Sequence, residues 1–216
     1  MKDYIVIGAG QAGMAISYYL TQEKKDFMVI DANRDIGAPW LKRWDSLTLF
    51  TVAEYNHLPG LDFPHPNGYY ANKYDVANYL KSYVEKFKIP IDFNQKINAL
   101  KKVDDHFVLE SENETYKAKN VIIATGPFHT PFTPKFHDKI ARDVIQIHSE
   151  NYKSPSQLQE GDTLVVGAGD SGVQILNEIS DTKRKVYFSG KVALDPTGII
   201  INNTDSTSSI DGIIKF

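Results

Sequence analysis

The 216-residue sequence contains no cysteine. Without thiols these residues can form no disulfide, no thiolate metal site and no Cys-x-x-Cys redox pair, so dithiol chemistry is excluded for them. The sequence also has no run of about 18 or more apolar residues, and no basic leader precedes the first strand-like segment in MKDYIVIGAGQAG. We therefore predict a cytoplasmic protein that does not enter a membrane.

Positive charge is not in excess either. There are 24 Lys and Arg residues against 27 Asp and Glu residues, a net charge of -3, and the two signs are interspersed along the chain. No basic surface that would attract a phosphate backbone is indicated, so we expect no nucleic-acid partner. With 42% apolar residues the chain can bury a substantial core, as one large domain or two small ones.

The amino-terminal segment has the pattern of a βαβ unit. Tyr4–Ile7 is a short apolar run, Ala12–Leu20 has helical spacing, and Phe27–Ile30 is a second apolar run that ends at Asp31. Between the first strand and the helix lies a Gly-x-Gly-x-x-Gly sequence, and this context makes the motif more specific than the pattern alone.

Each glycine of this first fingerprint has a physical role. Gly8 allows a tight turn, Gly10 lets a pyrophosphate approach the backbone, and Gly13 lets the helix pack close to the strand. The amino terminus of the helix then faces the phosphates. Asp31 follows Gly13 at the distance expected for the acid that holds a ribose hydroxyl, so the sequence predicts a dinucleotide site.

The middle of the chain carries no comparable motif. Residues 37–70 are rich in aromatic residues, Pro and Gly without either period, and we expect an ordered loop region there. The remaining patterns predict an amphipathic helix over Tyr74–Phe87, an antiparallel meander over Ile97–Lys101, His106–Ser111 and Thr115–Lys119, and a buried strand over Val121–Ala124.

The first unit is then repeated. A strand starting at Thr163, a helix over Val173–Ile179 and a strand over Val186–Phe188 enclose a second fingerprint made by Gly167, Gly169 and Gly172.

The end of the last of these strands indicates which nucleotide would bind there. The segment Ser189-Gly190-Lys191 has no carboxylate, whereas an acid at this place would repel a 2'-phosphate. Ser189 and Lys191 could donate to such a phosphate, and Arg184 is a further candidate donor. The alternative is that Arg184 and Lys191 are solvated cations on the surface. The charges favour NADPH over NADH.

Five segments together resemble the class B flavin-dependent monooxygenases, and most closely the bacterial flavin-containing monooxygenases. They are IGAGQAG, WLKRWDSLTLFT (Trp40 to Thr51), LPGLDFP (Leu58 to Pro64), VIIATG and LVVGAGDSG. The resemblance covers nearly all of residues 1 to 192. It implies an enzyme in which FAD binds first, NADPH reduces it, and O2 is then activated to oxygenate a small organic substrate, by N- or S-oxidation or by a Baeyer-Villiger reaction.

The resemblance also implies which residues contact the cofactors. At the FAD these are Gly8, Gly10, Gln11, Ala12 and Gly13 for the pyrophosphate, Asp31 for the ribose, and Trp40, Arg43 and Thr125 toward the flavin. At NADPH they are Gly167, Gly169, Asp170, Ser171 and Gly172, to which the argument from charge adds Ser189 and Lys191. Loop packing is the alternative role for Trp40 and Trp44. No catalytic side chain is identified, because the flavin carries the chemistry and the protein orients and shields it.

Two features depart from the family pattern. In the linker signature Phe-x-Gly-x-x-x-His-x-x-x-Tyr/Trp, His148 and Tyr152 match, but Arg142 and Val144 stand where Phe and Gly are expected. His148 alone is also compatible with a structural, hydrogen-bonded histidine. In addition, no Asn occurs near Phe50, where the heteroatom-oxygenating branch often places one. The type of oxygenation and the substrate therefore stay open.

The expected architecture is a three-layer α/β protein with two Rossmann-like units, an FAD-binding domain over residues 1–155 and a shortened NAD(P)-binding domain over residues 156–216. Family members are longer, and the tail GIIINNTDSTSSIDGIIKF resembles a late family segment, so the chain is expected to be truncated at its carboxyl end. Too few residues lie between Lys191 and Gly198, which indicates either an internal deletion or a degenerate, frameshifted product. Exposed apolar faces would then favour either association, for example as a homodimer, or instability.

Two other functions stay open. One is an inactive, truncated nucleotide-binding remnant, and the other is a flavin-reductase or ferredoxin-reductase type of enzyme, which needs both nucleotides but oxygenates no substrate. A disulfide reductase with the same two-fingerprint layout is set aside, because these residues contain no thiol.

Overall fold

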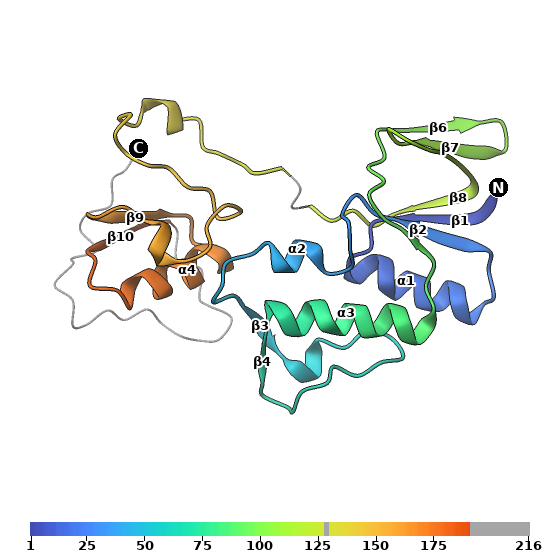
Figure 1. Cartoon of the computed structure of the whole chain (residues 1–216), viewed down its shortest axis with the longest axis horizontal. Helices are drawn as coiled ribbons and strands as arrows, with labels where there is room; N and C mark the ends of the chain where they lie inside the picture. The colour runs from blue at the N-terminus through green and yellow to red at the C-terminus, as the bar shows by residue number, and fades with distance from the viewer. Residues whose placement is uncertain (128–129, 191–216) are drawn as a thin grey trace. The chain divides into compact units, whose positions relative to one another are not determined.

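The computed structural model describes residues 1–127 and 130–190, and these form two compact units (Figure 1). The first unit comprises Met1–Lys42 and Thr51–Thr130. The second comprises Arg43–Phe50 and the residues from Pro131 onward. The backbone therefore passes from one unit to the other after Lys42, after Phe50 and after Thr130.

A six-stranded sheet in the order β5-β2-β1-β8-β7-β6 forms the centre of the first unit. Strands β5, β2, β1 and β8 run parallel, and β7 and β6 continue the sheet in antiparallel fashion. The strand bounds are β1 Lys2–Ile7, β2 Phe27–Ile30, β5 Ile91–Asp92, β6 Ala99–Val103, β7 His106–Glu110 and β8 Thr115–Ile123. The sheet core is built on Ile5, Ile30, Leu109 and Ala118, which are fully buried.

The predicted antiparallel meander is confirmed, but the two strands predicted over residues 115–119 and 121–124 are one strand, β8. Ala118 pairs with Phe107 of β7 on one side and with Lys2 of β1 on the other, so a single strand belongs to both the meander and the parallel sheet. Lys119 was predicted to end the first of these strands, and Asn120 lies between the two predicted ranges. Their side chains instead donate to the carboxylate and the backbone carbonyl of Asp3, at 2.8 and 3.0 Å.

Two long helices, α1 (Gln11–Gln22) and α3 (Lys73–Phe87), lie side by side on one side of this sheet (Figure 1). Helix α3 begins with a capping box, in which the side chain of Asn72 accepts the backbone N–H of Asp75 while the Asp75 carboxylate accepts the N–H of Asn72. It ends at Lys88, whose φ of 51° is left-handed.

The predicted loop region over residues 37–70 contains short regular elements that the sequence did not indicate. They are α2 (Ala38–Leu41), β3 (Thr48–Val52), the 3-10 turn η1 (Ala53–Tyr55) and β4 (Tyr70–Asn72), with β3 paired to β4. Two buried tyrosines of α3 hold the part of this region between η1 and β4 by hydrogen bonds. Tyr83 donates to the carbonyl of Pro59 and Tyr79 to that of Leu61, both at 2.6 Å. Burial raises the pKa of the Tyr83 hydroxyl.

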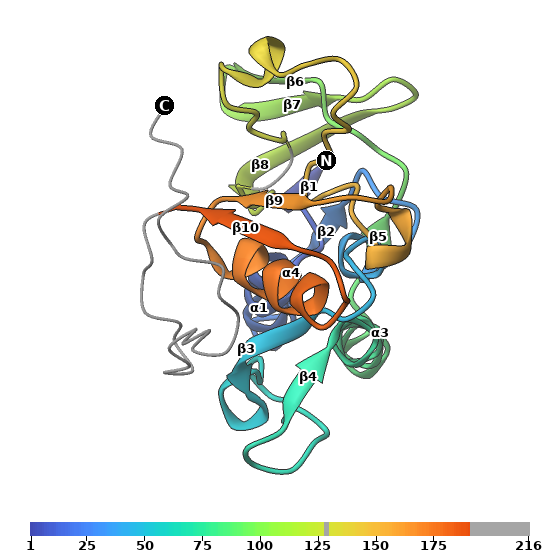
Figure 2. The same ribbon diagram turned by 90° about the vertical axis from the view of Figure 1, so that its left-hand side faces the viewer.

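The second unit contains a smaller βαβ arrangement. Strands β9 (Thr163–Val166) and β10 (Val186–Ser189) pair in parallel, and α4 (Asp170–Ser180) connects them and packs against both (Figure 2). Two 3-10 turns, η2 (His137–Lys139) and η3 (Pro155–Gln157), lie in the segment that precedes β9. This unit repeats β1-α1-β2, so the predicted α/β class with two Rossmann-like units is confirmed. Among the described helices, none is long and apolar enough to cross a membrane.

Candidate functional site: two glycine-rich turns

The first glycine-rich turn joins β1 to α1, and its geometry requires glycine at two positions. Gly8 has a φ of 108°, and a Cβ there would meet the carbonyl oxygen of Ala124 at 2.5 Å. A Cβ on Gly13 would lie 1.9 Å from the carbonyl oxygen of Gly8. The strand, the turn and the helix are therefore packed as closely as backbone alone permits.

Gly10 differs from these two glycines because the space in front of it is open. A Cβ on Gly10 would meet nothing within 4 Å. Gly10 is also the N-cap of α1, no side chain caps the helix, and the first turn contains no acidic residue. Gln11 and Ala12 of this turn are exposed. The turn thus presents uncapped backbone N–H groups and the positive end of the helix dipole to an open space, which suits a pyrophosphate.

Asp31 closes the other side of the turn. One oxygen of its carboxylate accepts the backbone N–H of Ala9 at 2.7 Å, and the other accepts the backbone N–H and the side-chain amide of Asn33 at 2.7 and 2.9 Å. These bonds fix the carboxylate at the end of β2, beside the glycine-rich turn. It is therefore held in the place where a ribose hydroxyl would be bound in a dinucleotide fold.

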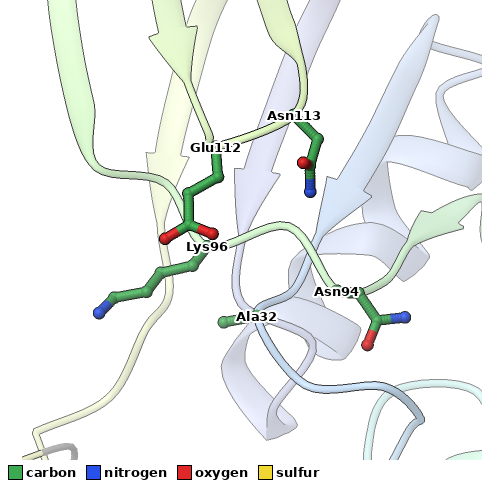
Figure 3. A pocket seen from close by; sticks show the side chains of 5 residues that line it. All are labelled: Ala32, Asn94, Lys96, Glu112 and Asn113. Atoms are coloured by element: carbon green, nitrogen blue, oxygen red, sulfur yellow. The ribbon is translucent and has the colours of Figure 1, made fainter.

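A cavity of about 260 Å³ lies next to Ala32, the residue after Asp31. Figure 3 shows its polar lining, which consists of the side chains of Asn94, Lys96, Glu112 and Asn113 around Ala32. The segment that carries Asn94 is attached to the end of β2, since the N–H of Asn94 donates to Asn33 and that of Gln95 to Asp31, at 2.9 and 3.0 Å. Amide groups that can donate and accept thus lie just beyond the ribose acid.

The second glycine-rich turn, between β9 and α4, repeats the first. Gly167 has a φ of 112°, and a Cβ on Gly172 would meet the carbonyl oxygen of Gly167 at 2.0 Å. Gly169 is the uncapped N-cap of α4, and the space in front of it is open as at Gly10, since a Cβ on Gly169 would meet nothing within 4 Å. The backbone bond that ties the turn to the next strand is also repeated, from Gly167 N–H to Ser189 at 2.8 Å, as from Gly8 N–H to Ile30 at 2.8 Å.

The two turns differ at two positions, and one of these differences changes the charge. Asp170 places a carboxylate in the first turn of α4, where α1 has Gln11. A carboxylate there favours the helix but repels a phosphate at the same helix end. Ser171, the next residue of this turn, is partly buried and carries no charge. On charge, the first turn therefore fits a pyrophosphate better than the second.

The structure separates the residues expected around a 2'-phosphate. Ser189 ends β10, at the same end of the strand as the glycine-rich turn. Arg184 precedes β10, at the opposite end, and its guanidinium donates to the backbone carbonyls of Leu158, Gln159 and Gly161. The interpretation of Arg184 as a phosphate donor is therefore wrong. Lys191 lies outside the described residues, as do the tail and the interval from Lys191 to Gly198.

The residues expected near the flavin fall in both units. Trp40 belongs to α2 in the first unit, and Thr125 is exposed after β8, beside Ala124, whose N–H donates to Ile7 at 2.8 Å. Arg43 is the first residue of the second unit. That they contact a flavin stays a prediction. Trp44 is 3% exposed and its indole N–H has no hydrogen-bond partner in the structure, which agrees with loop packing as its role.

The two matched residues of the linker signature have structural contacts. Nδ1 of His148 accepts the backbone N–H of Glu150 at 3.1 Å, so this nitrogen is engaged locally. Tyr152 is 3% exposed, and its hydroxyl donates to Glu178 of α4 at 2.8 Å. Burial raises the pKa of the Tyr152 hydroxyl, and the hydrogen bond to Glu178 raises it further. Both residues thus help to build the second unit.

Sequence reasoning missed two residues whose side chains hold neighbouring backbone or carboxylate groups in place. Asn33 holds the Asp31 carboxylate, and its place two residues after an aspartate is a known local turn pattern that could have indicated it. Gln174 of α4 bonds the backbone of Thr48, and no signal in the sequence relates two residues so far apart.

Comparison with known proteins places the chain in a family. The family model described as pyridine nucleotide-disulphide oxidoreductase matches residues 5–208. The chain is 43% identical over 188 residues to the uncharacterized oxidoreductase CzcO of Bacillus subtilis (strain 168), which covers 87% of this chain and 54% of CzcO. It is 33% identical over 177 residues to the probable indole-3-pyruvate monooxygenase YUCCA1 of Arabidopsis thaliana, covering 79% and 42%. The chain thus spans about half the length of the curated relatives it matches.

Solved structures give the same result. The flavin-containing monooxygenase from Stenotrophomonas maltophilia superposes with a TM-score of 0.82 at 28% identity, over 89% of this chain and 58% of that one. The OTEMO complex with FAD and NADP has a TM-score of 0.68 at 22% identity, over 87% and 38%, and shows likeness of fold alone. The expected resemblance to flavin monooxygenases is confirmed, and the chain belongs to the pyridine nucleotide-disulphide oxidoreductase family.

Proposed function

We propose that the chain is the nucleotide-binding part of an FAD-dependent oxidoreductase of the monooxygenase type, with FAD at the first glycine-rich turn and NADPH at the second. The observation that carries this proposal is the repetition of one turn geometry in both units, together with a fixed carboxylate, Asp31, at the end of β2 only. The assignment of residues 1–155 and 156–216 to the two cofactors is part of the proposal.

At the first turn, the backbone N–H groups of Gln11 and Ala12 would hold the FAD pyrophosphate and Asp31 the ribose. The adenine end would extend past Ala32 into the adjacent cavity. There the side-chain amides of Asn94 and Asn113 can form hydrogen bonds with the polar atoms of the adenine. All of these groups lie in the first unit, so the pyrophosphate and adenosine end of FAD would be held within that unit.

At the second turn, Ser171 and the first N–H groups of α4 would hold the NADPH pyrophosphate. The strand after α4 ends at Ser189 without a carboxylate, which permits a 2'-phosphate. Because Asp170 opposes a phosphate at this helix end, NADPH should bind less tightly than FAD. Bound together, the two groups would supply hydride-transfer and oxygen-activating chemistry, and the residues of the two turns would hold and orient them.

The relatives support this reading through their own names, which include flavin-containing monooxygenase and probable indole-3-pyruvate monooxygenase. The test is to reconstitute the purified chain with FAD, add NADPH without oxygen and follow the visible absorbance of the flavin. Bleaching by NADPH, with recovery on admitting O2, is the expected result. Failure to retain FAD would instead favour an inactive nucleotide-binding remnant.

The same experiment separates the remaining alternatives. Reduced flavin that returns its electrons to O2 as hydrogen peroxide, with every small heteroatom or ketone substrate tried, would favour a flavin-reductase type of function. NADH that bleaches the flavin as fast as NADPH would contradict the proposed cofactor preference. The cytoplasmic location and the homodimer stay predictions, and the size of the purified chain in solution tests the latter.

A further inference from the structure

Asn33 joins three groups around the proposed adenosine site, and all of them belong to the first unit. Its side-chain amide nitrogen donates to one oxygen of the Asp31 carboxylate at 2.9 Å, and its backbone N–H donates to the same oxygen at 2.7 Å. Its side-chain oxygen accepts a hydrogen bond from the ammonium of Lys42 at 3.2 Å. Its backbone carbonyl accepts the N–H of Asn94, whose side chain lines the cavity in Figure 3, at 2.9 Å. Every polar group of Asn33 thus has a partner in this unit.

The Asp31 carboxylate is held on both oxygens but retains the capacity for a further hydrogen bond. The oxygen that does not contact Asn33 accepts the N–H of Ala9 at 2.7 Å, so the two oxygens together accept three hydrogen bonds. A carboxylate offers about four lone-pair sites, and about one of them is therefore left. It belongs to the oxygen that accepts a single bond, which is the one bonded to Ala9 in the glycine-rich turn.

The side chain of Lys42 determines which way the Asn33 amide points. The oxygen and the nitrogen of an amide can exchange places by a half rotation, and the surrounding hydrogen bonds decide between the two orientations. Here the amide oxygen faces an ammonium group, which can only donate, and the amide nitrogen faces a carboxylate, which can only accept. The reverse orientation would break both bonds. Asn33 is therefore held in the orientation that donates to Asp31.

We infer that Asn33 is a positioning residue for the adenosine ribose of FAD, and that it acts through Asp31. By occupying one carboxylate oxygen with two hydrogen bonds, it turns the other oxygen toward the glycine-rich turn, where a ribose 2'-hydroxyl is expected to bind. An acceptor that is fixed before the ligand arrives loses less freedom on binding, so its contact contributes more to the affinity. This inference rests on the function proposed above.

The test removes the amide and keeps the backbone. Asn33→Ala loses the side-chain bonds to Asp31 and Lys42, while its carbonyl can still accept the N–H of Asn94. Each variant of the full chain is titrated with FAD and with the FAD analogue that contains 2'-deoxyadenosine, and the ratio of the two dissociation constants is compared. Because the two ligands differ in one hydroxyl group, a general weakening of the site cancels in this ratio.

The expected ratios follow from the strength of the ribose contact. In the wild type the deoxy analogue should bind about tenfold more weakly than FAD or worse, since it cannot make a hydrogen bond to a charged group. In Asn33→Ala the ratio should fall to about threefold, because only backbone donors still hold the acid. Lys42→Met should lower the ratio less than Asn33→Ala does. The control Arg34→Ala removes an exposed side chain from the adjoining residue and should keep the wild-type ratio.

A second background tests whether Asn33 acts through Asp31. Asp31→Ala removes the acceptor, and Asp31→Asn replaces it if urea unfolding shows that the alanine variant does not fold. The ratio should then fall to about one, and adding Asn33→Ala should change it no further, because two residues that act through one contact are not additive. A residue that contacted the ribose directly would still change the ratio in this background.

Four results would overturn the inference. An Asn33→Ala ratio equal to that of the wild type would show that Asn33 does not orient the acid. A change of the ratio by Asn33→Ala in the Asp31→Ala background would show a direct contact, and an equal loss of affinity for FAD and its analogue would show a purely structural role. If the wild type binds no FAD, the proposed function fails, and the same ratios are measured with ADP and 2'-deoxy-ADP at the site that Asp31→Ala weakens. Equal affinity of the wild type for those two nucleotides would overturn the inference as well.

Discussion

Replacing Gly10 with alanine should separate nucleotide binding from folding. The Gly10 backbone has φ of -77° and ψ of -174°, which alanine adopts readily, and an added methyl would meet no protein atom within 4 Å. Alanine is a poorer N-cap than glycine, but it also restricts the unfolded chain, and the two effects nearly cancel. We expect the free energy of unfolding of Gly10→Ala without nucleotide to change by less than about 1 kcal/mol.

The same methyl would stand where the proposed pyrophosphate approaches the helix. If it displaces the phosphate from one backbone N–H, a hydrogen bond to a charged group is lost, which contributes about 1.5 to 3 kcal/mol. The FAD dissociation constant should therefore rise by about 10- to 150-fold, at 1.4 kcal/mol for each factor of ten. Titration of the apoprotein with FAD, followed by quenching of flavin fluorescence, measures this change, and urea unfolding measures stability.

Gly13→Ala provides the contrasting variant. Its methyl would lie 1.9 Å from the carbonyl oxygen of Gly8, so helix and strand must move apart. Overpacking of this kind costs about 1 to 3 kcal/mol, and we expect that loss in the unfolding free energy without nucleotide. The reasoning would be refuted if Gly10→Ala bound FAD as tightly as the wild type, or if Gly10→Ala and Gly13→Ala were equally destabilised.

Three further outcomes are expected. Tyr83→Phe removes a hydroxyl that donates to Pro59, so its unfolding free energy should fall by about 0.5 to 1.5 kcal/mol with little effect on FAD binding. Burial raises the pKa of the Tyr83 hydroxyl in the folded state. The protonated hydroxyl therefore stabilises the fold below the unfolded pKa of about 10, and this stabilisation is lost as the pH rises beyond that value. In urea unfolding, the wild type should lose stability more steeply above this pH than Tyr83→Phe. Ser189→Asp should raise the NADPH dissociation constant about tenfold or more and leave that for NADH nearly unchanged, since the new carboxylate repels a 2'-phosphate; equal effects on both would contradict the placement of Ser189. Arg184→Met should lower the thermal midpoint of the second unit, because three carbonyls lose a donor, while the ratio of NADPH to NADH affinity stays the same.

The local parts of the site were predictable from the sequence because their constraints are local. The spacing of Gly8, Gly10 and Gly13 between an apolar run and a helical pattern specifies a tight turn that requires glycine at Gly8 and Gly13, and Asp31 follows at the end of the next strand. The repeat at Gly167 could be identified in the same way. Such motifs report backbone geometry directly, without knowledge of distant contacts.

The other parts depend on contacts between residues far apart in the chain. The bonds between Thr48 and Gln174 span 126 positions, and no periodicity in either segment indicates them. The phosphate-donor role predicted for Arg184 was wrong because the sequence near a strand does not show which groups its side chain bonds. The polar pair at Lys119 looked like a break between strands, since its partner Asp3 lies more than a hundred residues earlier.

The central claim is that the first glycine-rich turn binds FAD, and equilibrium binding of FAD to the full 216-residue chain tests it most directly. The purified protein is stripped of nucleotide, mixed with FAD, dialysed, and its flavin absorbance is compared with its protein concentration. The account predicts FAD bound in a stoichiometric amount, and lost from Gly10→Ala although this variant stays folded. A folded wild-type chain that retains no FAD, or a Gly10→Ala variant that retains as much as the wild type, would contradict it.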